Sequence, residues 1–147
     1  MQTHIEAAQM VFRRSVRLMG NAFEITVVAD DESWAEEKID HAVAEIRRIE
    51  SLLTTFSDES QTNQINRQAG VAPVRVDREV FELIRRSIRI SGVTDGAFDI
   101  TYGSIDKRLW NFDRSMTSLP DAATAKSMVR LINYRHILLD EVNSTVC

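Results

Sequence analysis

The spacing of apolar residues changes near residue 30, and this change limits the folds open to the 147-residue chain. Phe12, Val16 and Leu18 fall on one face of a half-buried strand and Arg13, Ser15 and Arg17 on the other. After the turn signal Met19-Gly20-Asn21-Ala22 the alternation resumes with Phe23, Ile25 and Val27. From Ile39 to Leu53 apolar residues recur at steps of three and four, which is the spacing of an amphipathic helix. The sequence therefore predicts a β-hairpin and then a long helix, begun by a capping box of Ser33 and Glu36, whose apolar stripe lies against a sheet.

Later segments continue this mixture of helices and short strands. The elements expected are a loop and short helix over residues 57–70, an edge strand near 74–76, a helix from Asp77 to Gly92, an extended segment over 98–102, a helix from Ser118 or Asp121, and a hairpin over 137–146. Helices separated by hairpins do not fit the parallel βαβ alternation. The fold class predicted is α+β, with antiparallel hairpins packed against amphipathic helices.

Length and charge narrow the range of partners. The chain fits a single domain over residues 1–147, and its hydrophobic fraction of 44% is typical of soluble globular proteins. A net charge of −4 argues against a nucleic-acid partner, which needs basic residues concentrated on one face. No apolar run approaches the ~20 residues of a membrane span, and the first residues lack a signal-peptide pattern, so the localisation is left open.

Familiar catalytic patterns are missing from the sequence. It contains no G-x-G-x-x-G, G-x-x-x-x-G-K-[ST], H-E-x-x-H or G-x-S-x-G, and its single cysteine, Cys147, cannot build a disulfide or a cysteine-based metal site. We therefore assign no catalytic residue and no metal ligand within the chain.

The segment from Thr94 to Thr101 gives the strongest indication of a binding site. Gly96 permits a turn with positive φ and Ala97 is small, so backbone amides there can come close to a flat ligand. The carboxylate of Asp99 can accept hydrogen bonds from an adenine amine, a ring N–H or a hydroxyl. Alternatively, Asp99 and Thr101 satisfy amides of the turn itself. The residues alone leave both interpretations open.

Four segments, in this order along the chain, are similar to motifs of one known family. They are Leu18-Met19-Gly20-Asn21-Ala22-Phe23, Glu50-Ser51-Leu52-Leu53-Thr54-Thr55-Phe56, Ser60 through Asn66, and Asp95-Gly96-Ala97-Phe98-Asp99-Ile100-Thr101-Tyr102-Gly103 with Leu109-Trp110-Asn111-Phe112. These resemble M-G-T, L-L-S-x-[YF], S-E-[IL]-x-x-[IL]-N and D-G-A-[FM]-D-I-T-x-G-P-L…L-W-x-F of the ApbE family, the FAD:protein FMN transferases. The resemblance runs from about residue 16 to residue 146. The chain departs from the pattern at Asn21, Gln61 and Ser104, where Thr, Glu and Pro are usual.

The resemblance implies an ApbE/T-fold-like arrangement and an FAD pocket. Its cofactor-binding residues would be Met19, Phe56, Ala97, Phe98 and Asp99, with the Phe56 ring stacked on a flavin or adenine ring. Three simpler interpretations stay open beside it. Phe56 can be a core residue that closes the helix, Met19 can be a packing residue, and Trp110 of the fourth segment is expected to be structural.

The resemblance also implies an activity. In such an enzyme Mg²⁺ neutralises the diphosphate while FMN moves from FAD to a Thr or Ser hydroxyl of an acceptor protein, leaving AMP. The metal ligands of the family lie in the second half of a chain about twice as long, so we expect residues 1–147 to be an N-terminal half that cannot transfer FMN alone. Alternatives are FAD hydrolysis to FMN and AMP, and a non-enzymatic flavin-binding module. Members of the family are often exported and lipid-anchored.

Overall fold

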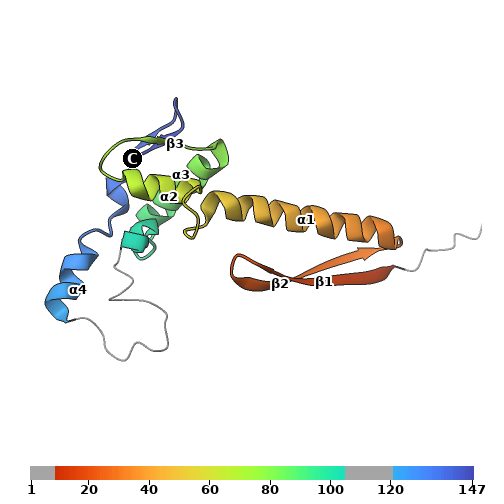
Figure 1. The fold of residues 1–147 in the computed structure, drawn as a ribbon. Helices are drawn as coiled ribbons and strands as arrows, with labels where there is room; N and C mark the ends of the chain where they lie inside the picture. Colours follow the sequence, from red (N-terminus) through yellow and green to blue (C-terminus); the bar gives the residue numbers. More distant parts are fainter. Residues whose placement is uncertain (1–8, 105–120) are drawn as a thin grey trace, which may run out of the picture. The chain divides into compact units, whose positions relative to one another are not determined.

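Residues 9–104 and 121–147 are described by a computed structural model, shown in Figure 1. They form two units, Met1–Gln64 and Ile65–Cys147, and both combine helices with antiparallel strands. The α+β class is therefore confirmed. The predictions for Trp110 and for a helix start at Ser118 lie outside the described residues, and the single domain over residues 1–147 stays a prediction.

The first unit begins with a two-stranded antiparallel sheet. Strand β1 (Met10–Leu18) pairs with β2 (Asn21–Ala29) along their whole length. The connecting residues Met19 and Gly20 have φ angles of 51° and 73°. Positive φ at both central residues is the pattern of a type I′ turn, whose twist matches that of the strands. The predicted hairpin is confirmed, with its turn at these two residues.

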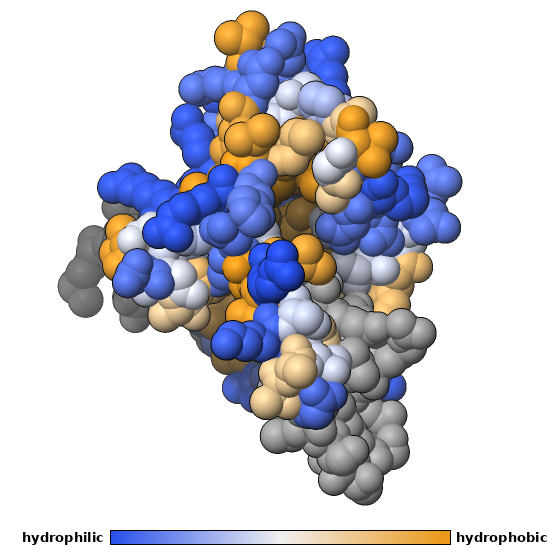
Figure 2. Space-filling model, turned by 90° about the vertical axis from the view of Figure 1, so that its left-hand side faces the viewer, coloured by the Kyte–Doolittle hydropathy of each residue, from blue (hydrophilic) through white to orange (hydrophobic). Residues whose placement is uncertain are grey.

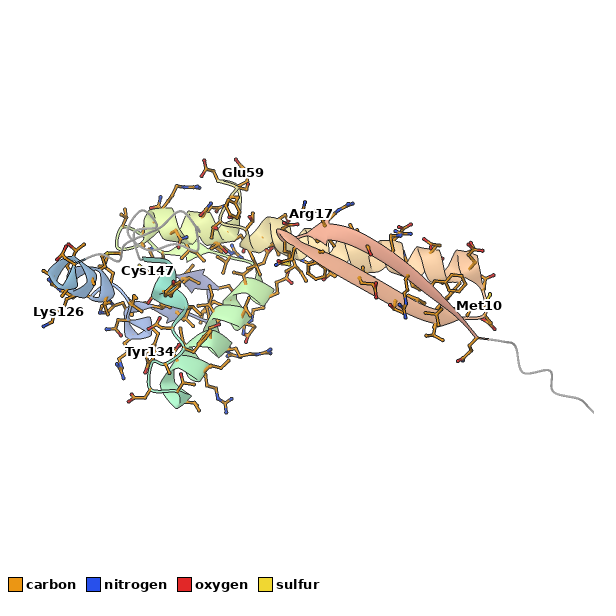
Figure 3. The ribbon with its side chains drawn as sticks, turned by 90° about the horizontal axis from the view of Figure 1, so that it is seen from below. Met10, Arg17, Glu59, Lys126, Tyr134 and Cys147 are labelled. Atoms are coloured by element: carbon orange, nitrogen blue, oxygen red, sulfur yellow. The ribbon has the colours of Figure 1, made fainter. Side chains whose placement is uncertain are left out.

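Helix α1 (Glu32–Leu53) covers one face of the hairpin, as Figures 1 and 3 show. The core of this unit contains Leu18, Ile39 and Val43, and half-buried apolar residues of both strands pack around them. The predicted apolar stripe of α1 is confirmed, because Ile39 and Val43 are buried in this core. The predicted capping box is wrong, because the N-cap is Asp31, whose carboxylate accepts a 2.6 Å hydrogen bond from the N–H of Trp34. An aspartate in extended conformation meets the capping requirement two residues before Ser33.

A short loop joins α1 to α2 (Gln61–Gln68), and Gly70 follows with a φ of 71°. The Ser60 hydroxyl accepts a 3.1 Å hydrogen bond from the N–H of Asn63, so Ser60 caps the first turn of α2. The prediction of a polar loop entering a short helix is confirmed.

The second unit contains a three-stranded antiparallel sheet and a long helix. Strand β5 (Thr145–Val146) lies between β3 (Val74–Arg75) and β4 (Leu139–Asp140), and both pairings are antiparallel. Helix α3 (Arg78–Val93) buries Val80 and Phe81. The predicted edge strand, helix and final hairpin are confirmed, although the helix continues one residue past Gly92. Helix α4 (Ala122–Val129) starts at the predicted cap Asp121.

The expectation of an extended segment over residues 98–102 is wrong. The chain there turns into the 3₁₀-helix η1 (Ile100–Ser104), because the Asp99 carboxylate accepts a 2.9 Å hydrogen bond from the N–H of Thr101. A second 3₁₀-helix, η2 (Tyr134–His136), lies close to α3. Among the described helices, none is both long and apolar enough to cross a membrane.

Candidate functional site

Met19 occupies the hairpin turn in a conformation that is unfavourable for its residue type. Its φ of 51° lies in the left-handed region, which Gly and Asn adopt more readily than Met. The N–H of Met19 donates a 3.0 Å hydrogen bond to a carboxylate oxygen of Glu50, which lies in the last turn of α1. The side chain is 39% exposed. The turn is thus held against the helix while the Met19 side chain reaches the surface.

Phe56 follows the end of α1 by three residues, and the hydrogen bond from Met19 to Glu50 holds the hairpin turn at that same end of α1. Its side chain is 95% exposed, which makes the interpretation as a core residue wrong. The structure therefore brings Met19 and Phe56 to one end of this unit, and both side chains are available to a ligand there.

The turn that contains Ala97 lies in the second unit and uses its own amides. Gly96 has a φ of 80°, as the turn prediction requires. The N–H of Gly96 donates to the carbonyl of Ser91 at 2.8 Å, the N–H of Ala97 to the carbonyl of Thr94 at 3.0 Å, and the N–H of Phe98 to the Thr94 hydroxyl at 3.2 Å. These three amides are engaged within the chain. The side chains of Ala97 and Phe98 are exposed, so it is these two side chains that the turn presents to solvent.

Asp99 and Thr101 connect this turn to a segment more than thirty residues later. One carboxylate oxygen of Asp99 accepts hydrogen bonds from the N–H and the hydroxyl of Thr101, at 2.9 and 2.7 Å. The other accepts a 2.8 Å hydrogen bond from the N–H of Tyr134. The Thr101 hydroxyl in turn accepts a 2.8 Å hydrogen bond from the N–H of Asn133. The two side chains thereby fasten η1 to the first residues of η2.

These contacts keep the Asp99 carboxylate ionised. Burial raises the pKa of Asp99, but the hydrogen bonds from Thr101 and Tyr134 together outweigh it, so the pKa lies below its ordinary value. A carboxylate has about four lone-pair sites, and three are filled from the described residues. Asp99 thus satisfies one amide of its own turn, as the alternative interpretation expected, but its second oxygen and the Thr101 hydroxyl accept from amides outside the turn. The role of Asp99 toward a nucleotide, through one remaining site, stays a prediction.

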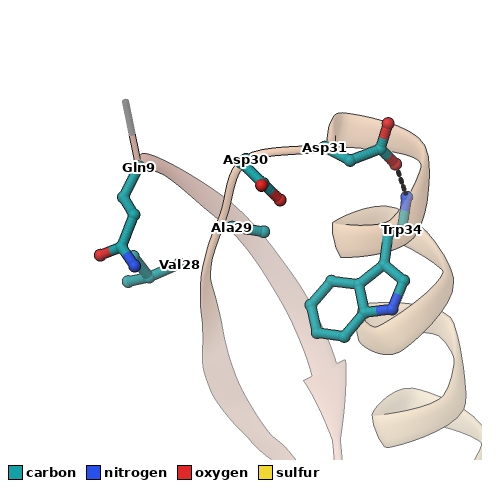
Figure 4. Close-up of a pocket in the computed structure, with 6 residues that line it drawn as sticks. All are labelled: Gln9, Val28, Ala29, Asp30, Asp31 and Trp34. Carbon is teal, nitrogen blue, oxygen red and sulfur yellow. Dashed lines mark hydrogen bonds between the residues drawn. The ribbon is translucent and has the colours of Figure 1, made fainter. Parts of the chain in front are cut away.

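A hollow lies where the end of β2 leads into α1, as Figure 4 shows. It is lined by Gln9, Val28, Ala29, Asp30, Asp31 and Trp34. None of the five predicted binding residues borders it, and Asp31 is already engaged as the cap of α1. We therefore attribute no binding role to it.

Among the residues that the structure describes, other surface features single out no second site. Several large apolar side chains of the second unit are exposed, and Figure 2 shows apolar surface (orange) interrupted by polar side chains (blue). Within residues 9–104 and 121–147, no group of three His, Cys, Asp or Glu side chains is placed to hold a metal ion.

The five predicted residues fall into two sets. Met19 and Phe56 belong to the first unit, whereas Ala97, Phe98 and Asp99 belong to the second, and each set is grouped within its own unit. Glu50 and Asn63 hold the first set in place but are not singled out by the sequence patterns. The spacing of Ser60 and Asn63 is that of an N-cap residue and the third residue of its helix, and this spacing was the available signal for Asn63.

Comparison with known proteins places the chain in a family. The model of the ApbE family matches residues 19–146. An FAD:protein FMN transferase of Klebsiella pneumoniae (strain 342) is 35% identical over 136 residues, which are 92% of this chain and 42% of that protein. An FAD:protein FMN transferase of Salmonella typhimurium is 30% identical over 76% of this chain and 33% of its own length. The chain thus spans less than half the length of these curated relatives.

Solved structures support the same placement at the level of the fold. The ApbE protein of Thermotoga maritima superposes with a TM-score of 0.79 at 24% identity, over 93% of this chain and 44% of that one. The apo form of the flavinyl transferase ApbE of Pseudomonas stutzeri gives a TM-score of 0.76 at 22% identity, over 95% and 44%. With the four ordered motifs and the match over residues 19–146, these findings show that the chain belongs to the ApbE family.

Proposed function

We propose that the protein containing this chain transfers FMN from FAD to a Thr or Ser hydroxyl of an acceptor protein. In this proposal residues 1–147 supply part of the surface that grips FAD. The residues proposed to contact FAD are Met19 and Phe56 in the first unit, and Ala97, Phe98 and Asp99 in the second.

The observation that carries the proposal is the 35% identity, over 92% of the chain, to a relative named FAD:protein FMN transferase. Two features of the site support it. Phe56 exposes nearly its whole ring, although an exposed Phe contributes little to folding. Met19 stays in a left-handed conformation that Asn or Gly would adopt at lower cost, and such outliers often mark functional positions.

The reaction is a phosphoryl transfer in which one bond forms and one breaks. The acceptor oxygen bonds to the phosphorus of the FMN half of FAD, the bond from that phosphorus to the bridging oxygen breaks, and AMP leaves with the bridging oxygen while the hydroxyl proton passes to a base. In such a reaction most of the catalysis comes from positioning and charge stabilisation. The proposed contribution of this chain is positioning: a stacking surface at Phe56 and a hydrogen-bond acceptor at Asp99.

Mg²⁺ would supply the charge stabilisation. Among the described residues no group of three or more His, Cys, Asp or Glu side chains is placed to hold a metal ion, so these residues do not form a metal site by themselves and we derive no step through Mg²⁺ from this chain.

The proposal is tested with the protein made from its complete reading frame. The protein is incubated with FAD, Mg²⁺ and an acceptor protein that carries a flavinylation site. We expect a fluorescent acceptor band that survives denaturing electrophoresis, together with one AMP per label. Release of FMN and AMP without a labelled acceptor would indicate an FAD hydrolase instead. FAD binding without AMP release would indicate a flavin-binding module.

A further inference from the structure

One side chain binds the backbone carbonyls of the residues on either side of Phe56. The Nδ2 atom of Asn63 donates a 3.0 Å hydrogen bond to the carbonyl of Thr55 and a 2.8 Å hydrogen bond to the carbonyl of Ser57. An amide nitrogen carries two N–H groups, so these two bonds use its whole donor capacity. Phe56 is therefore the middle residue of a three-residue arch that is fastened at both ends by one side chain.

The anchor of this arch is itself fixed. The N–H of Asn63 donates a 3.1 Å hydrogen bond to the hydroxyl of Ser60, and the N–H of Ser60 donates a 3.2 Å hydrogen bond to the carbonyl of Ser57. Ser60 is only 1% exposed. The N–H of Phe56 donates to the Thr54 hydroxyl at 3.2 Å, which also fixes the other side of the arch. The loop is therefore ordered by hydrogen bonds and not by burial of its aromatic residue.

An ordered loop with an exposed ring makes sense if the ring has a ligand. Ordering the backbone costs conformational entropy, and burial of a Phe side chain would offset part of that cost. Phe56 is 95% exposed, so burial of its ring offsets almost none of this entropic cost within the described structure. Ordering of the loop before binding removes that entropic cost from the binding step.

We propose that Asn63 is a positioning residue for flavin nucleotide binding: it holds Phe56 in the orientation in which the ring stacks on a planar ring of FAD. The inference rests on the proposed function, because it takes FAD as the ligand. It goes beyond that function because Asn63 acts through Phe56 and itself contacts only the loop.

Four variants of the full-length protein test this role. Asn63→Asp keeps the shape of the side chain but replaces the donor by a carboxylate facing two carbonyls. Gln64→Glu is the matched control, because the Gln64 amide donates a 3.0 Å hydrogen bond to the carbonyl of Glu59, on the same loop but away from Phe56. Phe56→Ala and the double variant Phe56→Ala/Asn63→Asp complete a thermodynamic cycle. FAD affinity is measured by titration, and KM and kcat by AMP release.

We expect Asn63→Asp to weaken FAD binding about three- to tenfold, whereas Gln64→Glu changes it less than twofold. The loss should appear in the KM for FAD while kcat at saturating FAD changes little, since the contact is the same in the ground state and the transition state. In the Phe56→Ala background the Asn63→Asp substitution should have no further effect. A purely structural role would not produce this dependence on Phe56.

Three outcomes would overturn the inference. They are an unchanged affinity in Asn63→Asp, an equal loss in Gln64→Glu, and a loss in Asn63→Asp that persists in full when Phe56 is already Ala. If Asn63→Asp does not fold, Asn63→Ala removes the same donors and enters the same cycle. Failure of the wild-type protein to bind FAD would instead contradict the proposed function, so the two failures are distinguishable.

Discussion

The backbone N–H of Met19 and the carboxylate of Glu50 are joined by a 3.0 Å hydrogen bond across thirty-one residues of sequence. This bond fixes the turn of the β1–β2 hairpin against the last turn of α1, and the loop that carries Phe56 begins directly afterwards. Two of the five predicted FAD contacts thus share one end of the first unit because a single side chain connects the turn to the helix.

The strain at Met19 predicts opposite effects on stability and on binding. Met19→Asn places Asn-Gly in a type I′ turn, so we expect the free energy of unfolding to rise by about 1 kcal/mol. The bond to Glu50 uses the backbone N–H and is retained. FAD affinity should nevertheless fall, because the Met19 side chain is lost. Denaturant unfolding and FAD titration measure the two effects.

Ser144 provides the control for this substitution. It has a φ of 52° in the turn between β4 and β5 and lies outside the predicted site. Ser144→Asn should therefore relieve the same kind of strain without any change in FAD affinity. An unchanged affinity in Met19→Asn would remove Met19 from the binding surface.

Phe56 and Phe81 should respond to truncation in opposite ways. Phe56 is 95% exposed and Phe81 is 1% exposed. Phe81→Ala should lower the free energy of unfolding by about 3–5 kcal/mol, whereas Phe56→Ala should leave it nearly unchanged. Phe56→Ala should weaken FAD binding about 2- to 10-fold, which corresponds to a lost aromatic stack. A large loss of stability in Phe56→Ala, seen by thermal unfolding, would show that the ring is buried after all.

Removal of the Asp99 charge should loosen the junction between η1 and η2. In Asp99→Asn an amide nitrogen replaces one oxygen and faces an N–H donor, either that of Thr101 or that of Tyr134. We expect a loss of about 1–3 kcal/mol in the free energy of unfolding, which is typical for an unsatisfied hydrogen-bonding group. Denaturant unfolding at neutral pH measures it, and equal stability of the two proteins would contradict the described contacts.

The same contacts predict a pH dependence. Because the pKa of Asp99 is lowered in the folded protein, its contribution to stability is fully present above the unfolded pKa and is lost as the pH falls through the folded value. The difference in unfolding free energy between wild type and Asp99→Asn should thus be constant above about pH 5 and shrink below about pH 4. Other carboxyl groups are common to both proteins and cancel. A difference that does not vary between pH 3 and pH 7 would be inconsistent with an ionised, hydrogen-bonded Asp99.

Sequence patterns predicted the elements whose signals are local. The alternation around Gly20 and the stripe from Ile39 to Leu53 gave the hairpin and α1, because strand and helix periods are visible in short windows. The observed cap of α1, Asp31, differs from the predicted Ser33 because both are good N-cap residues and only the backbone conformation decides between them.

Contacts distant in sequence account for what the patterns missed. Residues 98–102 alternate like a strand, but Asp99 accepts a hydrogen bond from the N–H of Thr101 and the chain forms a 3₁₀ turn. The N–H groups of Asn133 and Tyr134, which also donate to Thr101 and Asp99, lie outside any local window. The hydrogen bond from Met19 to Glu50 cannot be predicted from a local pattern either, because its two partners are thirty-one residues apart. The predicted binding residues came from a resemblance of motifs, which identifies positions without showing what holds them.

A crystal structure of the protein with FAD bound would test the central claim most directly. We predict that a flavin or adenine ring lies against the Phe56 side chain, with the Met19 side chain also in contact with the nucleotide. FAD bound elsewhere, with Phe56 still fully exposed to solvent, would contradict the account.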